Sequence, residues 1–448
     1  MPCDILPRVP PPDAVPDPGR PLVITRRSVV SWVLYDLANT IFSMNIISFY
    51  FSLYVRDEVG IERADGVYGL TTAISMGVVF FLSPLLGAMT DHARRRVPFL
   101  IVSTVLCITF TALLGQGGLG PSLAFFVIAN IAYQAGLQFY DALLAEVSTE
   151  ENRGRVGGTG VGVGYLGSFV GLGTGYLMLA VLHTGKVPLF QVTALLFLIF
   201  ALPSFFWIRE RGNPRGRGFS RAAIAAAARQ VRDTLRASGR YPGLFRFLIG
   251  RVFYTDPVNT VIAIMGLYVT NAAARAGLDA GASESFAWGI MITAVGFAVV
   301  GGFVWGSIVD RIGPKRTLTI VLWTWIGDFL AVAAAGGLAL PLWTFYLTST
   351  VAGLALGGTW AADRPFMLRL SPPSRIGEFY GLYNMVGRFS AVTGPLLWAV
   401  IVGWVFRGNP HAGQPAAVLS LAALVVVSYL ILRPVSDHRR DWTKSERG

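Results

Sequence analysis

The chain has 448 residues, of which 53% are hydrophobic and only 14% are charged, and its formal net charge is +12. Soluble proteins carry roughly a quarter charged residues, so this chain has too little polar side chain to cover a water-exposed surface. The composition therefore excludes an ordinary soluble globular protein and predicts an integral membrane protein.

Long apolar stretches recur along the chain, and each is long enough to cross a bilayer. Residues 1–28 are rich in proline and arginine and contain no apolar signal core, so we expect a disordered cytoplasmic tail. Six spans are predicted before a basic linker at 208–242, over residues 29–55, 67–90, 97–115, 121–147, 156–183 and 187–207. Six more are predicted over residues 243–270, 286–309, 316–337, 341–369, 377–406 and 414–433, followed by a second cytoplasmic tail at 434–448.

These spans predict an all-α integral membrane protein of about twelve transmembrane helices in two six-helix bundles, 29–207 and 243–433. The distribution of basic residues predicts its orientation. Of the 37 lysines and arginines, 29 lie in the tails, the linker and alternate connections, whereas the opposite connections hold five. This asymmetry follows the positive-inside rule, and it predicts a multi-pass protein of the cell (inner) membrane with both termini cytoplasmic. It also explains the positive charge without a nucleic-acid partner.

The two halves contain matching residues at nearly one offset. Asp36, Asn39 and Thr40 recur with the same spacing in a second D-x-x-N-T element, Asp256, Asn259 and Thr260. The pair Gly87 and Asp91 recurs as Gly306 and Asp310, and three glycines, Gly154, Gly158 and Gly171, recur as Gly377, Gly381 and Gly394. The matches indicate a duplication. Because an even number of spans separates each pair, the repeats are parallel.

The run GSIVDRIGPKR, from Gly306 to Arg316, resembles the cytoplasmic loop motif of the major facilitator superfamily, and 87–96 resembles a degenerate copy. Within that superfamily, three segments are similar to the autophagy-related vacuolar amino-acid effluxer family and its bacterial relatives: SWVLYDLANTIFS, AEVSTEENRGRVGGTGVGVGYLG and RLSPPSRIGEFYGLYNMVGRFSAVTGPLL. The resemblance implies the major facilitator fold and export of amino acids or similar small polar metabolites. The Asp363-Arg364 pair departs from the family pattern, in which a small hydroxyl residue precedes the arginine.

The duplicated loop motif predicts a cytoplasmic gate. A glycine lets two helices approach closely, and the following aspartate is placed to face the positive N-terminal end of a neighbouring helix and nearby arginines. The alternative is that the acids only cap loops and the basic residues only set topology. The candidate gating residues are Gly87, Asp91, Arg95, Gly306, Asp310, Arg311, Gly313, Lys315 and Arg316.

Apart from charged residues near the span ends, eight charged residues lie inside the predicted spans: Asp36, Asp141, Arg251, Asp256, Asp328, Asp363, Arg364 and Arg388. A charge at mid-depth costs about 2.5–3.5 kcal/mol on insertion scales, so each should face a cavity or a partner. In both D-x-x-N-T elements the three polar side chains share one helical face. We expect Asp36 and Asp256 to face one another across a central cavity and to handle substrate or protons, the alternative being helix packing.

Arginines in the second half are candidate partners for these acids or for a substrate. Arg388 is expected to bind a substrate carboxylate or an intramembrane aspartate. Arg364 is expected either in the pathway or in a local cluster with its neighbour Asp363. Asp141 and Glu146 are expected to pair with arginines of the following loop, Arg153 or Arg155. Asp328 receives no role from the sequence.

The leading function is secondary active transport by alternating access, with protons as a candidate coupling ion, because each repeat carries a titratable aspartate. Two alternatives stay open: cation-coupled uptake of sugars or amphiphilic solutes, and a non-transporting scaffold or receptor whose polar faces only hold helices together. The chain contains no Walker A run, and we expect no enzymatic activity, cofactor or metal. The expected partners are a small-molecule solute and membrane lipids, with the protein a monomer.

Overall fold

The computed structural model describes the chain except residues 1–23, 212–220, 237–240, 242, 408 and 439–448. Every regular element in the described part is a helix. The predicted tails lie mostly outside the described residues, and the first helix begins at Arg26, where Thr25 and Ser28 form a capping box.

The helices follow the predicted spans in order. In the first half they are α1 (Arg26–Phe42), a π-helical stretch (Ser43–Tyr50), α2 (Phe51–Val59), α3 (Ile61–His92), α4 (Val97–Ala112), α5 (Leu119–Ala142), α6 (Leu144–Val147), α7 (Arg153–Tyr176) and α8 (Lys186–Trp207). In the second half they are α10 (Leu244–Arg275), α11 (Ala280–Ile312), α12 (Pro314–Gly337), α13 (Thr344–Leu370), α14 (Ile376–Val400) and α15 (Pro410–Leu432).

Nine helices among the described residues are long and apolar enough to cross a membrane. The three remaining predicted spans are the run from α1 to α2, the 16-residue α4, and α13, which carries Asp363, Arg364 and Arg369. Each of these three packs lengthwise against helices of the nine: α1 on α7 and α8, α4 on α5 and α8, and α13 on α11 and α12. They therefore occupy the positions of crossing helices in the fold.

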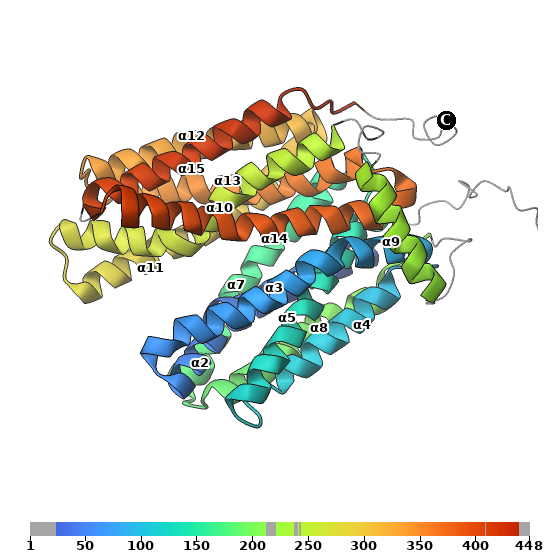
Figure 1. The fold of residues 1–448 in the computed structure, drawn as a ribbon, viewed down its shortest axis with the longest axis horizontal. Coiled ribbons are helices and arrows are strands. Elements are labelled where there is room, and N and C mark those ends of the chain that lie inside the picture. The colour runs from blue at the N-terminus through green and yellow to red at the C-terminus, as the bar shows by residue number, and fades with distance from the viewer. Residues whose placement is uncertain (1–23, 212–220, 237–240, 242, 408, 439–448) are drawn as a thin grey trace, which may run out of the picture.

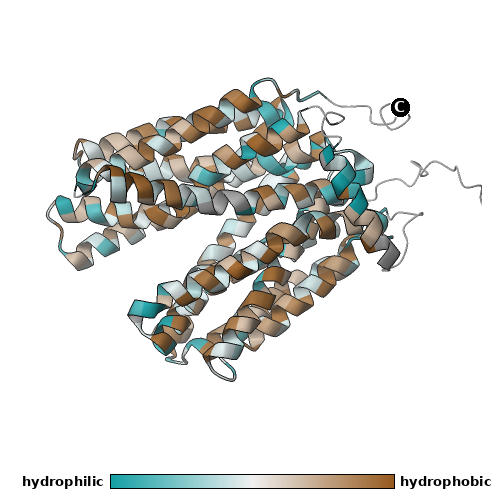
Figure 2. Cartoon of the chain, in the orientation of Figure 1, coloured by the Kyte–Doolittle hydropathy of each residue, from teal (hydrophilic) through white to brown (hydrophobic). Residues whose placement is uncertain are grey.

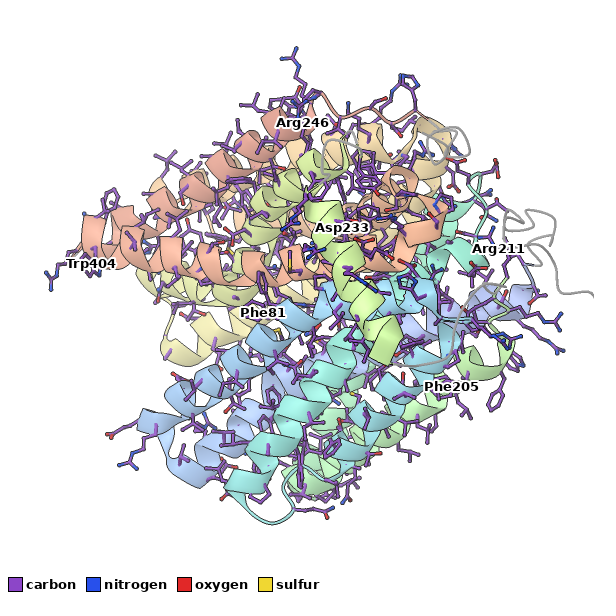
Figure 3. The ribbon with its side chains drawn as sticks, turned by 45° about the vertical axis from the view of Figure 1, so that its right-hand side comes forward. Phe81, Phe205, Arg211, Asp233, Arg246 and Trp404 are labelled. Carbon is purple, nitrogen blue, oxygen red and sulfur yellow. The ribbon has the colours of Figure 1, made fainter. Side chains whose placement is uncertain are left out.

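Figure 1 shows α1–α8 and α10–α15 as two groups of helices, joined by a segment that contains one further helix, α9 (Arg221–Arg236). Hydrophobic residues cover much of the length of the helices, whereas hydrophilic residues gather at the ends near α9 (Figure 2). Phe81 and Trp404 lie on the outside, 79% and 83% exposed, as expected of side chains that face lipid (Figure 3). We call the end of the molecule that carries α9 the linker end.

Two long helix pairs join the halves, α3 with α14 and α7 with α11. Both pairs approach through glycines. A Cβ on Gly158 of α7 would lie 2.6 Å from the Cα of Gly306 in α11, and one on Gly87 of α3 would collide with the carbonyl of Gly377 in α14. Because these glycines belong to the duplicated motifs, the two interfaces are copies of one another. Without a hydrophobic drive between helices in lipid, such close backbone contact supplies the packing.

The duplication extends to a structural irregularity. A π-helical turn follows α7 at Leu177–Val181, and another follows α14 at Ile401–Val405. The number of residues that separates these two turns is close to the number that separates the matching glycines of α7 and α14. A π-helical turn is rare and tends to be retained for a reason, so its recurrence supports the common origin of the two halves.

The helix α9 was not predicted from the sequence, which indicated only a basic linker. Its alanines and long polar side chains are good helix formers. Ala227 is buried against Met89 of α3, and the Gln230 amide donates a hydrogen bond of 2.5 Å to Glu378 of α14. The helix therefore contacts both halves at the linker end (Figures 1 and 3).

Candidate functional site

The first loop motif places Asp91 at the N-terminus of a helix from the other half. Its carboxylate accepts hydrogen bonds of 2.8 Å from the backbone N–H groups of Gly377 and Glu378, at the start of α14. The unsatisfied N–H groups of a first helical turn favour such an anion. The arginine that joins the contact is Arg96, whose guanidinium lies 3.0 Å from Asp91. This corrects the expectation for Arg95, which is exposed.

The second loop motif makes the equivalent contact, with the aspartate in the second half and the helix N-terminus in the first half. Asp310 of α11 accepts hydrogen bonds from the backbone N–H groups of Gly154 (2.6 Å) and Arg155 (3.1 Å), at the start of α7. The Arg155 guanidinium adds an ion pair of 2.9 Å. The neighbouring Arg311 is exposed. Gly313 has φ +89°, a conformation that favours glycine, and it turns the chain into α12.

We call these two contacts the linker-end latches: Asp91 on α14, and Asp310 on α7. Each joins a helix of one half to the N-terminus of a helix of the other half, beside the glycine contacts described above. The sequence correctly predicted that each aspartate meets a helix N-terminus and a nearby arginine, but it could not predict which helix or which arginine. In this structure both latches are formed, so the two halves are held together at the linker end.

In each half, a carboxylate from the chain beyond the last membrane-crossing helix binds the start of the third membrane-crossing helix, which is α4 or α12. No pattern in the sequence indicates this contact. In the first half, Glu210 accepts hydrogen bonds from the backbone N–H groups of Arg96 (2.5 Å) and Val97 (2.6 Å) at the start of α4. Burial raises the pKa of Glu210, while these hydrogen bonds act in the opposite direction. In the second half, Asp437 accepts from the Lys315 N–H at the start of α12, over 3.3 Å.

A neighbouring ion pair is duplicated with its charges exchanged. Glu146, at the end of α6, pairs with Arg211 beyond α8 at 3.2 Å. Arg369, near the end of α13, occupies the position that matches Glu146 at the offset of the duplicated glycines, and it pairs with Asp437 beyond α15 at 2.6 Å. The expected pairing of Glu146 with arginines of the following loop is therefore wrong, because the chain beyond α8 folds back onto this helix end.

Between the halves, three buried charges form a triad. Arg364 of α13 lies 3.3 Å from Asp36 of α1 and 3.0 Å from Asp141 of α5. Its guanidinium also faces the ring of Tyr140, 5.4 Å from the ring centroid. The arginine comes from the second half and both acids come from the first, so the triad crosses the interface. The expected pairing of Asp141 with loop arginines is wrong, as is a cluster of Arg364 with Asp363.

Asp363 instead belongs to a second cluster, contained within the second half. Its carboxylate lies 3.1 Å from the Arg251 guanidinium and accepts hydrogen bonds from the hydroxyls of Tyr383 (2.7 Å) and Tyr254. The Arg251 guanidinium also lies over the Tyr383 ring, 3.6 Å from its centroid. Successive residues of an α-helix point about 100° apart, which sends Asp363 and Arg364 to different neighbours. Sequence reasoning missed this cluster because its partners lie on other helices and, for Arg251 and Tyr254, far away in the chain.

Arg388 has no ion pair with an acidic residue among the described residues. It is half-buried on α14, and its Nε is buried without a hydrogen-bond partner in the described part of the chain. Asn39 of α1 is 2% exposed, and neither its amide nitrogen nor its oxygen has a partner in that part. The adjacent Thr40 donates to the Asp36 carbonyl at 3.0 Å. Unpaired polar groups of this kind are rare in a packed core, and each requires an explanation such as a bound water, ion or solute.

The second D-x-x-N-T element has a different environment. Asp256 of α10 accepts a hydrogen bond of 2.6 Å from the backbone N–H of Gly394 in α14, and Thr260 donates to the Asp256 carbonyl at 2.8 Å. Asn259 is half-buried. Asp256 thus packs on a helix of its own half, whereas Asp36 pairs with an arginine of the other half. No direct contact joins the two acids in the described part of the chain, so their facing one another across a cavity stays a prediction.

Asp328 lies apart from both clusters. It is 4% exposed on α12, and one of its carboxylate oxygens has no hydrogen-bond partner among the described residues. The described part of the chain holds no group of three or more His, Cys, Asp or Glu residues placed to bind a metal ion. The site is therefore organised by arginine, carboxylate and amide groups.

Two parallel helical repeats, latched at one end and enclosing charges between them, define a transporter of the major facilitator superfamily. Solved structures share this fold. The human organic anion transporter MFSD10 matches with a TM-score of 0.69 at 15% identity, over 91% of this chain and 99% of that one. A bacterial homologue of the iron transporter ferroportin, in an outward-facing state, matches with a TM-score of 0.70 at 15% identity, over 92% and 100%.

Within this class the chain belongs to the family of Atg22-like vacuole effluxers, whose model matches residues 145–441. An uncharacterised MFS-type transporter of Bacillus subtilis, YxiO, is 25% identical over 91% of this chain and 94% of its own length. Autophagy-related protein 22-1 of Sclerotinia sclerotiorum is 25% identical over 60% of this chain, and the match spans about half (48%) of that longer protein.

Proposed function

We propose that the protein is a secondary active transporter that exports amino acids, or similar small polar metabolites, by alternating access. The observation that carries the proposal is the Arg388 guanidinium, which forms no ion pair within the described ranges, together with the acid-rich triad. Arg364 neutralises only one of the two charges on Asp36 and Asp141, so this group has one acid in excess. A cation that lacks an ion pair in the described part of the chain, combined with an excess acid, suits a solute that carries both a carboxylate and an ammonium.

The roles follow from these charges. Arg388 binds the carboxylate of the solute, because a guanidinium offers paired donors to that group. Asp36 and Asp141 receive the ammonium. The Asn39 amide, which has no hydrogen-bond partner among the described residues, lies on the same face of α1 as Asp36 and offers a donor and an acceptor. An ammonium that contacts the acids weakens their hold on Arg364. Since Arg364 comes from the other half, solute binding is coupled to the contact between the halves.

Transport requires the linker-end latches to open and close in each cycle. With both latches formed, the structure suits the state in which the linker end is closed. The excess of arginine in the connections at this end supports its placement in the cytoplasm, with the protein in the cell membrane. A proton is the candidate coupling ion, because intramembrane aspartates can bind one when the conformation changes their surroundings.

The test is exchange of labelled amino acids by purified protein in liposomes. We expect the wild type to exchange at least one amino acid, Arg388→Ala to lose nearly all of this activity, and Arg388→Lys to keep part of it. Arg246→Ala is the matched control, because Arg246 is exposed at the start of α10 (Figure 3), and it should transport normally. Wild-type exchange by Arg388→Ala, in protein of unchanged thermal stability, would contradict the proposed role of this arginine.

A further inference from the structure

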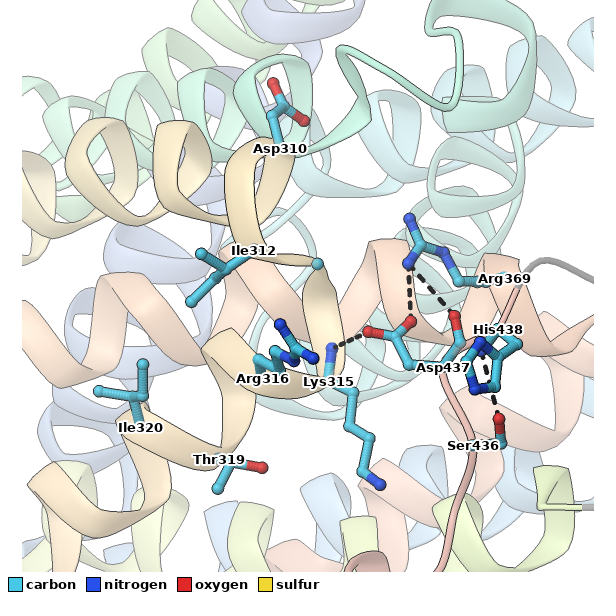
Figure 4. Close-up of a pocket in the computed structure, with 11 residues that line it drawn as sticks. Asp310, Ile312, Lys315, Arg316, Thr319, Ile320, Arg369, Ser436, Asp437 and His438 are labelled. Carbon is cyan, nitrogen blue, oxygen red and sulfur yellow. Dashed lines mark hydrogen bonds and ion pairs between the residues drawn. The ribbon is translucent and has the colours of Figure 1, made fainter.

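A pocket of about 770 Å³ opens at the linker end, between the end of α11, the start of α12 and the segment after α15 (Figure 4). Asp310 of the second latch is among its lining residues, but the other lining residues take no part in the latches or in the buried clusters that the proposed transport cycle uses. Lys315, Arg316 and Thr319 of α12 line it, together with Arg369, Asp437 and His438. Lys315 and Arg316 are candidate gating residues, yet neither contributes to the latch contacts described above, so the latches do not explain why this space is lined by cations.

The cations of the pocket exceed its available acids. Asp310, which also lines the pocket, is engaged by the N-terminus of α7 and by Arg155, and Asp437 is engaged by Arg369. Lys315 donates one hydrogen bond of 2.9 Å to the backbone carbonyl of Arg433, which leaves its charge unneutralised. Arg316 is exposed, and neither it nor Lys315 forms an ion pair within the described ranges. The pocket therefore attracts an anion.

The same pocket has an apolar wall on the surface that faces lipid. Ile312 and Ile320 line it, with 37% and 45% of their surface exposed. Trp323, one turn further along α12 than Ile320, is 52% exposed. An exposed apolar strip on a membrane-crossing helix lies against acyl chains, so the ligand of this pocket combines an anionic head with an apolar body.

The first half provides an internal comparison. The spacing between Asp91 and Asp310 matches Arg316 with Val97 of the first half. The spacing between the duplicated glycines matches Arg369 with Glu146 of the first half. The equivalent position in the first half therefore lacks one cation and carries an acid in place of another. Both halves nevertheless form a latch. The cations of the pocket are thus not a by-product of the duplicated latch, and they call for a separate explanation.

We propose that this pocket binds the headgroup of an anionic phospholipid of the same leaflet. The phosphate accepts hydrogen bonds from the Arg316 guanidinium, the Lys315 ammonium and the Thr319 hydroxyl, and an acyl chain lies along Ile312 and Ile320. A bound lipid joins the α11–α12 turn to the end of α15. Because Asp310 of the second latch lies on that turn, the lipid stabilises the latched state.

Native mass spectrometry of delipidated full-length protein tests the proposal, with added phosphatidylglycerol or phosphatidylcholine as probes. We expect the wild type to retain phosphatidylglycerol in preference to phosphatidylcholine. The double substitution Lys315→Ala with Arg316→Ala should weaken phosphatidylglycerol binding by about tenfold or more, because each basic residue contributes to the attraction. Arg229→Ala with Arg232→Ala is the matched control, since both arginines are exposed on α9 at the same end, and it should bind normally.

Thermal unfolding separates the possible sources of the phosphate. Phosphatidylglycerol should raise the melting temperature of the wild type, and inorganic phosphate or glycerol 3-phosphate at the same concentration should not. Equal binding of both lipids, unchanged binding by the pocket variant, or protection by the soluble phosphates alone would each overturn the proposal. Because Lys315 and Arg316 lie at the surface, the melting temperature of the variant without lipid reports directly whether it is folded.

Discussion

Three arginines that lie inside the predicted spans, away from the span ends, have different electrostatic surroundings. Arg251 is neutralised inside its own half by Asp363, Arg364 is shared by two acids of the other half, and Arg388 has no acidic partner in the described part of the chain. Each would cost about 2.5–3.5 kcal/mol in lipid without compensation. Arg251 forms contacts within one half and Arg364 links the halves, whereas Arg388 is the arginine to which the proposed function assigns the solute.

The two aspartates of the D-x-x-N-T elements should respond differently to neutralisation. Asp36→Asn removes a charge that Arg364 needs, so we expect solute exchange to fall by about tenfold or more, as for the loss of a charged partner. Asp256→Asn keeps an oxygen that can accept from the Gly394 N–H, so its exchange should stay within a few-fold of the wild type. Exchange in liposomes and thermal stability, measured on both variants, check this contrast.

If both variants lost exchange equally, Asp36 and Asp256 would act as a symmetric pair. That result would contradict the separate roles given to the two residues. A pH gradient adds a second readout. If Asp36 carries the coupling proton, Asp36→Asn should also lose the dependence of net flux on that gradient, while Asp256→Asn retains it.

At the scale of helices, the halves meet through glycine contacts and through carboxylates placed on helix N-termini. Both latches use the partial positive charge of a first helical turn, which contributes about 0.3–1 kcal/mol for each exposed charge and up to about 2 kcal/mol when partly buried. Energies of this size hold a closed end without preventing its opening. They suit elements that must be broken and formed again in each cycle.

Asp310→Asn should shift the protein toward the state that is open at the linker end. The substitution removes the charge that faces the α7 N-terminus and Arg155 but preserves the size of the side chain. The distance between spin labels at the exposed positions 95 and 311, in protein without Cys3 and Cys107, should shift to larger values. Asp233→Asn on the exposed face of α9 is the control and should leave the distance unchanged.

Solute affinity should remain within a few-fold of the wild type in Asp310→Asn, because Asp310 lies outside the buried clusters. Loss of solute binding by a folded Asp310→Asn protein would show that the residue does more than close the linker end.

The α7–α11 contact should not tolerate a large side chain. In Gly158→Leu the new side chain meets the backbone of Gly302 and Gly306, so we expect this interface to separate and exchange to be lost. Gly173→Ala lies in the same helix, where a Cβ meets no atom within 4 Å, and it should be neutral or slightly stabilising. Exchange and melting temperature of both variants measure the effect. Normal exchange by Gly158→Leu would mean that the close contact is dispensable.

For the whole molecule, the distribution of basic residues predicts its orientation in the membrane. The linker, both tails and the loops that follow the latch aspartates hold most of the arginines. Single cysteine labels at residue 229 of α9 and at residue 445 should therefore react with a membrane-impermeant reagent only after the cells are opened. A label at residue 57, at the opposite end of the first helical run, should react in intact cells. Reaction of residue 229 or 445 in intact cells would contradict the proposed topology.

The sequence by itself determined the helices, their duplication and the type of contact at the latches. Hydrophobic length is a local property of each span, so α5, α8 and α12 begin and end within a few residues of their predictions. The repeat offset paired Asp91 with Asp310 without any knowledge of the fold. The helix α9 was missed because its signal is helix propensity in a charged stretch, which carries no apolar span.

The tertiary structure alone decided which charges pair. Sequence adjacency suggested a cluster of Arg364 with Asp363, and the loop motif placed Arg95 in the gate. The observed pairs are instead Arg364 with Asp36 and Asp141, and Arg96 with Asp91. A helix turns about 100° per residue, so adjacent side chains face different helices, and their partners come from distant parts of the chain. Only when the two halves are packed together does one intramembrane arginine become shared between them and another remain without an acid.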